Sequence, residues 1–183
     1  TYGVDAVPTG AANAILLRGK PILTPMDMTL VNRDILRPFM GNGDALVGSI
    51  YSKLSFEVEI ASSGTAGTAP ALGVLLRAAG LSQNILATAV TGTAQSSAIA
   101  GTVRLSAAAS AVNDFYTGLP ISITAGIGLG QTGVITQYDG VSKLAYVSGL
   151  NWSVPDATST YSINPGVVYR PVSSAFESVT LYF

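Results

Sequence analysis

The stretch from Lys53 to Gly80 constrains the fold more than any other part of this chain. Apolar and polar residues alternate strictly from Lys53 to Ile60, which predicts a strand with one buried and one solvated face. Residues 61–69 are small and predict a flexible loop, and Pro70 suits the first turn of a helix, where its missing N–H is not needed. Apolar residues then recur every three or four positions until Gly80, a common helix terminator. We therefore predict one short amphipathic helix over about residues 70–80, in a chain that otherwise consists of strands.

The composition indicates an ordered chain with an unusually uncharged surface. The 183 residues are 48% hydrophobic and can bury a core, whereas only 10% are charged, against a usual share of about 25%. Mixed surface charge normally keeps a monomer from associating. Two interpretations fit this deficit: neighbouring subunits cover much of the surface, or the chain is a stable β-protein coated with Ser and Thr.

Catalysis by this chain alone is not expected. The chain has no His and no Cys, so Ser-His and Cys-His nucleophiles are impossible, and none of its three lysines has the Ser-x-x-Lys spacing. A net charge of -1 with scattered basic residues argues against tight binding of nucleic acid. No apolar run reaches the roughly 20 residues that cross a bilayer. We predict no enzyme activity, no cofactor, no metal and no membrane partner.

Three motifs resemble functional sites, and for each we favour a structural interpretation. Residues 128–133 match the dinucleotide pattern G-x-G-x-x-G, but the sequence after them continues a strand instead of opening a helix, which favours a Gly-rich hairpin. Glu57 and Glu59 share one face of a strand about 7 Å apart, in the range of glycosidase carboxylates, yet one strand cannot hold a sugar from both sides. Three aspartates lack a calcium-loop spacing and are better interpreted as turn formers: Asp114, Asp139 and Asp156.

From about residue 85 to 165 the sequence changes to short strands separated by frequent turns, a pattern typical of a small β-sandwich or barrel. Asp139-Gly140 predicts a hairpin with a type I′ turn, because both central residues of that turn need positive φ. We therefore predict an inserted all-β module over 85–165, within a discontinuous domain formed by 1–84 and 166–183. The strands predicted in the module are 102–105, 120–124, 133–138, 144–148 and 160–163.

Outside the module, longer strands joined by irregular segments are predicted. Residues 1–14 form an extended arm, and strands are expected at 14–17, 26–36, 167–169 and 176–183. The segment Arg33–Ser49 is predicted to be a long loop because of its Pro and Gly residues. Apolar side chains on such a loop usually need a surface to pack on.

The aromatic residues of the module allow two interpretations. They form either a platform for a sugar ring on the surface or part of the core, and strand aromatics more often pack across neighbouring strands. The residues concerned are Trp152, Tyr116, Tyr138 and Tyr161. As surface-binding aromatics, Trp152 and Tyr138 are the candidates.

Residues 55–61, 63–71 and 75–80 together resemble the tail tube (major tail) proteins of long-tailed bacteriophages. Their sequences are Ser-Phe-Glu-Val-Glu-Ile-Ala, Ser-Gly-Thr-Ala-Gly-Thr-Ala-Pro-Ala and Leu-Leu-Arg-Ala-Ala-Gly. The arm 3–13, the segment 31–42 and the closing runs 169–174 and 176–180 are similar to the same family. The region 85–165 lies outside that pattern and looks like a small β-module found within phage virion proteins.

The resemblance implies a mainly β, tail-tube-like β-sandwich or barrel subunit with one short flanking helix. Six copies would form a ring whose inner sheets close into a continuous barrel, and rings would stack into a tube. DNA would pass through the lumen at infection without specific binding, and other tail proteins would occupy the tube ends. The chain would assemble in the host cytoplasm and reside in the virion. Ring closure also removes exposed sheet edges, which a β-protein with little charge needs.

Specific roles follow from this expectation. Glu57 and Glu59 are the candidates for facing the lumen, because basic linings would hold the phosphates of DNA. The module should face outward, since a domain of about 80 residues would obstruct a narrow channel. The N-terminal arm and the long loop are candidates for contacts between rings, with the loop residues Arg33, Arg37, Phe39, Met40, Asn42, Asp44 and Leu46. The alternative function is a virion decoration module or a β-sandwich that binds a receptor or glycan.

Overall fold

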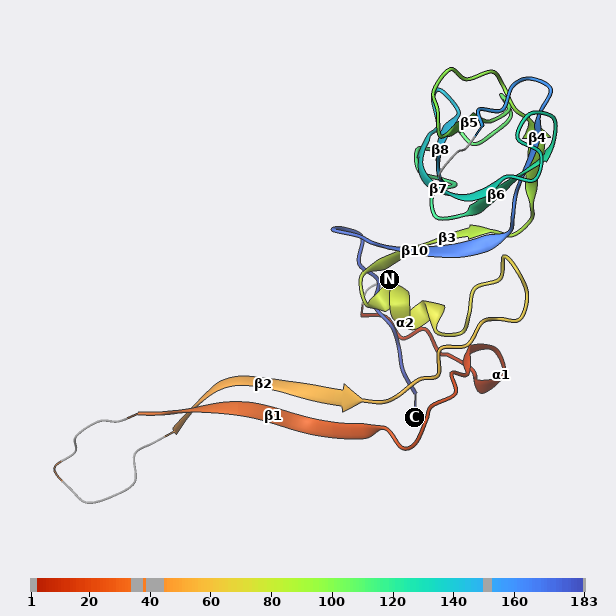
Figure 1. Cartoon of the computed structure of the whole chain (residues 1–183). Helices are drawn as coiled ribbons and strands as arrows, with labels where there is room; N and C mark the ends of the chain where they lie inside the picture. Colours follow the sequence, from red (N-terminus) through yellow and green to blue (C-terminus); the bar gives the residue numbers. More distant parts are fainter. Residues whose placement is uncertain (1–2, 34–37, 39–44, 150–152, 183) are drawn as a thin grey trace. The chain divides into compact units, whose positions relative to one another are not determined.

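The computed structural model describes residues 3–33, 38, 45–149 and 153–182 (Figure 1). The chain forms two compact units, one made of Asn13–Ile60 and the other of Thr1–Ala12 with Ala61–Phe183. The fold is mainly β, as predicted, and helix is confined to two short segments of the described chain. This division differs from the predicted domains: segments on both sides of the module fall in one unit with it, whereas the long hairpin of the other unit forms a two-stranded sheet of its own among the described residues.

The unit Asn13–Ile60 is built around a long antiparallel hairpin. Strand β1 (Ile22–Asn32) pairs with β2 (Ala45–Ser55), and each strand has 11 residues. The predicted loop Arg33–Ser49 is therefore wrong at its second end, because Ala45–Ser49 belong to β2. Gly48 falls at a register shift opposite Thr29 and Leu30. The extra residue of this bulge interrupts the alternation of apolar and polar residues from which strands are predicted.

The predicted strand Lys53–Ile60 ends earlier than its alternating pattern indicates. Only its first three residues belong to β2, and beyond them the segment forms one antiparallel bridge, between Val58 and Leu17. The strand predicted at 14–17 is reduced to that same bridge. Ile60 lies on the apolar face that the pattern predicts to be buried, yet it is 87% exposed, because the paired part of the segment ends before it.

The predicted helix is confirmed as α2 (Gly73–Ala78), and a single further helical turn, α1 (Gly10–Asn13), was not predicted. Gly80 has a φ of +89°, which favours glycine and ends the helix. The chain then forms β3 (Leu81–Leu86), which pairs with β10 (Gly166–Pro171) in a two-stranded antiparallel sheet that we call the stem. No helix of the described residues has the length and apolar character needed to cross a membrane.

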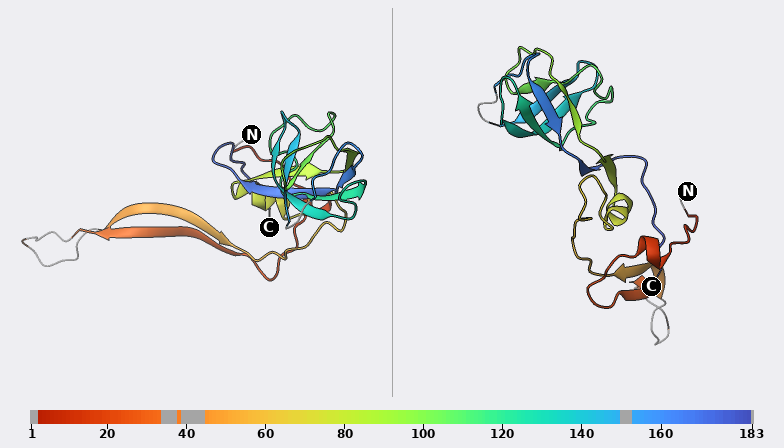
Figure 2. Two further views of the ribbon diagram at one scale, coloured as in Figure 1. Left: turned by 45° about the horizontal axis from the view of Figure 1, so that its top comes forward. Right: turned by 90° about the vertical axis from the view of Figure 1, so that its right-hand side faces the viewer.

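The predicted module is inserted between the two stem strands as a six-stranded antiparallel sheet, in the order β4-β9-β6-β7-β8-β5. The sheet curls until Gln95, just after β4, bridges Arg104 in β5, so that its two edges meet (Figure 2). We call this module the barrel. Five predicted strands are confirmed to within one residue at each end, whereas β4 was missed because it is short and contains Gly92. The bounds are β4 (Val90–Thr93), β5 (Thr102–Arg104), β6 (Pro120–Ala125), β7 (Thr132–Asp139), β8 (Leu144–Ser148) and β9 (Thr160–Ile163).

The barrel contains the hydrophobic core of the described chain. Every buried hydrophobic side chain among the described residues lies between Leu86 and Ile163. Val103, Ile135 and Ile163 have no exposed surface. The hairpin contributes none of these buried side chains, so the packed interior of the described chain lies in the barrel and at its junction with the stem.

Two predicted turns of the barrel form, one of them with different geometry. Residues 128–131 lie in the connection from β6 to β7, and residues 132 and 133 are the first two of β7. The segment is therefore a Gly-rich hairpin, as predicted, and does not open a helix as a dinucleotide-binding motif would. The hairpin at Asp139 exists, but its turn spans residues 140–143 and the positive φ falls on Lys143, at +60°. The Asp139 carboxylate accepts hydrogen bonds from Ser142 Oγ at 2.6 Å and Val141 N at 2.9 Å, which lower its pKa.

The predicted strand at 176–183 is not formed by its described residues. An extended segment becomes a strand only when a neighbouring strand pairs with it, and no described strand pairs with this one. Single contacts hold the segment instead: Tyr182 donates to Asp5 Oδ2 at 2.5 Å, and Arg77 forms an ion pair with Glu177 at 2.9 Å.

Candidate assembly surface

The register of the β1–β2 hairpin separates its side chains into two faces. Residues paired across an antiparallel ladder lie on the same side of the sheet, and the side alternates along each strand. An apolar hairpin face is formed by the pairs Leu23 with Leu54, Met28 with Ile50, and Leu30 with Val47. The opposite face, which we call the polar hairpin face, has the pairs Thr24 with Lys53, Asp27 with Tyr51, and Thr29 with Ser49 at its centre. Towards its two ends it also carries exposed apolar side chains, those of Ile22, Val31 and Leu46.

The apolar hairpin face is not covered by its own unit. Five of its six side chains are exposed, with fractions from 39% at Met28 to 62% at Leu23, and only Leu54 is half-buried. Completing the burial of five such side chains is worth about 5 kcal/mol. A two-stranded hairpin is at best marginally stable in water, and each strand here also has one unpaired edge. The hairpin therefore has both the need and the surface for a further partner.

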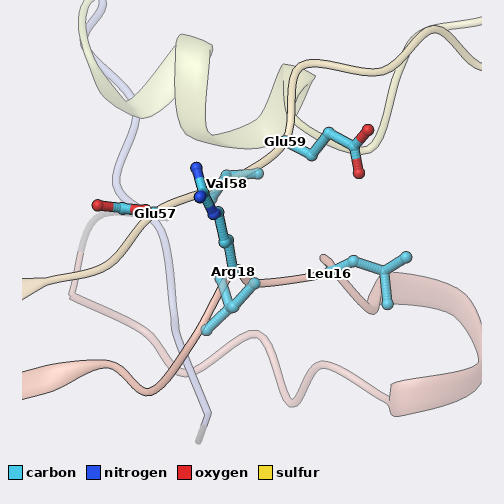
Figure 3. Close-up of a pocket in the computed structure, with 6 residues that line it drawn as sticks. Leu16, Arg18, Glu57, Val58 and Glu59 are labelled. Carbon is cyan, nitrogen blue, oxygen red and sulfur yellow. The ribbon is translucent and has the colours of Figure 1, made fainter.

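An open groove of about 720 Å³ lies where the two ends of this unit's chain meet (Figure 3). The Leu17–Val58 bridge and the hydrogen bond from Arg18 N to Glu57 O, at 2.9 Å, hold the two segments together. In Figure 3 the carboxylates of Glu57 and Glu59 lie on opposite sides of the Arg18 side chain. The lining residues are Leu16, Leu17, Arg18, Glu57, Val58 and Glu59.

The charges of this groove do not neutralise one another by direct contact. Within the part of the chain that the structure describes, Arg77 and Glu177 form the one ion pair, so Arg18 makes none with either glutamate. Both glutamate side chains are exposed to solvent. Two carboxylates beside one guanidinium leave the groove with an excess of negative charge. Arg18 is a member of this site that the sequence pattern did not indicate.

The predicted ring contacts are only partly within the described residues. Arg33 is exposed directly after β1, and Leu46 is 52% exposed in β2, where it pairs with Val31. The remaining candidates lie outside the described residues: Arg37, Phe39, Met40, Asn42 and Asp44.

The surface role considered for Tyr138 is wrong. Its side chain is 1% exposed, its ring contacts that of Tyr116 edge to face at 4.9 Å, and its hydroxyl donates to Ser110 O at 2.6 Å. Tyr116 and Tyr161 are also buried, which confirms core packing for these three aromatics. Trp152 lies outside the described residues.

Burial of Tyr138 predicts an alkaline limit to the stability of the barrel. Burial raises the pKa of the Tyr138 hydroxyl above its usual value near 10, because the charged phenolate is disfavoured there. Its contribution to stability is thus complete below pH 10 and is lost as the pH rises further, where the unfolded chain ionises first. We expect Tyr138→Phe to flatten the fall in the free energy of unfolding between about pH 9 and about pH 11, measured by urea titration.

The control for that measurement is Tyr51→Phe, since Tyr51 is 53% exposed on the hairpin. Tyr138→Phe should also cost about 1 kcal/mol at neutral pH through the lost hydrogen bond. An alkaline slope that stays the same in Tyr138→Phe would contradict the assignment.

Comparisons with known proteins leave the family of the chain open. The chain matches no family model, no curated protein and no solved structure.

Proposed function

We propose that this protein is a structural subunit that assembles into hexameric rings, and that the rings stack into the tail tube of a long-tailed bacteriophage. The observation that carries the proposal is the exposed apolar hairpin face, which the unit that bears it leaves uncovered. A second copy can cover this face, because a chain with few charged residues has few groups that would repel another copy of itself. The resemblance of residues 55–80 to tail tube proteins supports the same assembly.

A ring requires head-to-tail contact between copies. The apolar hairpin face of each copy would therefore pack on a different surface of the next copy, one that does not include the polar hairpin face. Such heterologous contacts close into a ring when the rotation permits. Pairing at the free edges of β1 and β2 would add main-chain hydrogen bonds and remove those edges from solvent.

The groove carries the proposed lining of the conduit. Glu57 and Glu59 would face the lumen, where their excess negative charge keeps DNA from adhering to the wall. The barrel would project outward, because a closed domain with its own core adds bulk that a lumen cannot accommodate.

The alternative, a barrel that binds a receptor or glycan, has less support from the described residues. Three of the barrel's four tyrosines are in its core, and Tyr146, the remaining one, is 37% exposed. A glycan platform needs several exposed rings or one ring within a polar pocket.

Electron microscopy of the purified protein tests the proposed function. Negative-stain images should show six-fold rings or stacked tubes, and sedimentation should show a species much heavier than the 18.6 kDa chain. If the protein remains a monomer at every concentration tested, the proposed assembly is wrong.

A further inference from the structure

The barrel and the stem are joined by more than the chain that connects them. A turn at residues 112–118, which precedes β6, presents backbone carbonyls to the stem. Arg170 of β10 donates from Nη1 to Asp114 O at 3.1 Å and from Nη2 to Thr117 O. Asn84 of β3 donates from Nδ2 to Phe115 O at 2.5 Å. Each stem strand thus contributes one side chain to the same turn.

The residue types suit this task. A guanidinium is planar, stays charged and offers several N–H donors in a fixed fork, so Arg170 can hold two carbonyls at a set angle. A single flexible donor would permit rotation about its bond, whereas three donors from two strands fix the turn in position. We call Arg170 and Asn84 the clamp.

Close packing beside the clamp shows that the barrel is seated directly on the stem. Gly118, at a φ of +84°, lies so near Val168 that an added Cβ would be 3.0 Å from its Cγ1. An added Cβ at Gly166 would be 2.9 Å from Leu119 Cδ2. Val168 also packs against the barrel core. The junction therefore has no room for an intervening layer of water.

We propose that Arg170 and Asn84 fix the barrel at one angle to the stem, so that barrel and stem move as one body. Without the clamp, the two short connections 87–89 and 164–165 would serve as a hinge, since domains move relative to one another unless a large hydrophobic interface holds them, and hinges lie in a few loop residues. The clamp is a property of one chain and holds whether or not copies assemble. In an assembly, it would make the barrel a rigid projection with a fixed direction.

Distance measurement by double electron–electron resonance tests the clamp in the full chain. The chain has no Cys, so spin labels attach only where cysteines are introduced. One pair, Ile85→Cys with Val141→Cys, joins the stem to an exposed site of the barrel. A second pair, Val141→Cys with Leu129→Cys, lies within the barrel and reports whether it stays folded. Dilution with unlabelled chain removes distances between copies.

The expected result is a narrow stem-to-barrel distance distribution in the otherwise unaltered chain. In the double variant Arg170→Ala, Asn84→Ala it should broaden about twofold or more, while the distribution within the barrel stays narrow. Arg170→Lys, which keeps the charge but loses the fork, should give an intermediate width.

Three outcomes would overturn the clamp. The first is a broad stem-to-barrel distribution in the unaltered chain, and the second is an unchanged width in the double variant. The third is broadening within the barrel in both the double variant and Arg170→Lys, because the side chains would then hold the barrel fold itself and not its angle.

Discussion

Replacing Ile50 by aspartate should abolish self-association of the chain. Ile50 is 60% exposed and pairs with Met28 at the middle of the apolar hairpin face. If a second copy covers this face, the new carboxylate must lose its water without gaining a partner, which costs several kcal/mol. A loss of about 4 kcal/mol lowers an association constant about a thousandfold. Sedimentation velocity and negative-stain microscopy at matched concentrations would measure the change.

The matched control is Ser49→Asp, one residue earlier on the same strand. Ser49 lies on the polar hairpin face, where its hydroxyl is 2.7 Å from that of Thr29, and an aspartate there can still accept that hydrogen bond. The control should assemble as the unaltered chain does. Equal assembly of both variants would show that the apolar face is not an interface, and equal failure would show that added charge, not the face, is responsible.

The sequence was most informative where strands are short and turns are frequent. In the barrel, Gly, Pro, Asn and Asp mark nearly every turn, so that β6, β7, β8 and β9 could be located to within one residue. The hairpin was harder, because the bulge at Gly48 hides the alternation of β2. The apolar hairpin face follows only from the register across two such bulges, which no local pattern specifies.

The site residues show the same limit. Glu57 and Glu59 could be found from alternation along one strand, whereas Arg18 reaches their groove through a bridge between distant segments. The contact of Arg170 with Asp114 likewise joins positions 56 residues apart. Alternation also predicts that Tyr138 and Asp139 point to opposite sides, but the inner side of a barrel is known only after the sheet closes.

Replacing Ile135 by alanine should destabilise the protein strongly without affecting its assembly surface. Ile135 has no exposed surface and lies in the barrel core on β7. Removing its methyl groups leaves a cavity in a close-packed interior, which costs about 3 kcal/mol. For a barrel of this size, that loss lowers the midpoint of thermal unfolding by roughly 12–24 °C. Thermal unfolding followed by circular dichroism would measure the shift.

Two control variants show whether the thermal transition reports unfolding of the barrel or of the hairpin. Val134→Ala removes an aliphatic side chain from the preceding residue, which is 44% exposed, and should change the free energy of unfolding by less than about 1 kcal/mol. Ile50→Ala alters the other unit and should leave the same transition unchanged in dilute, unassociated protein. If Ile50→Ala lowered the midpoint as much as Ile135→Ala, hairpin and barrel would unfold together, and the hairpin would then be stabilised within its own chain instead of by a second copy.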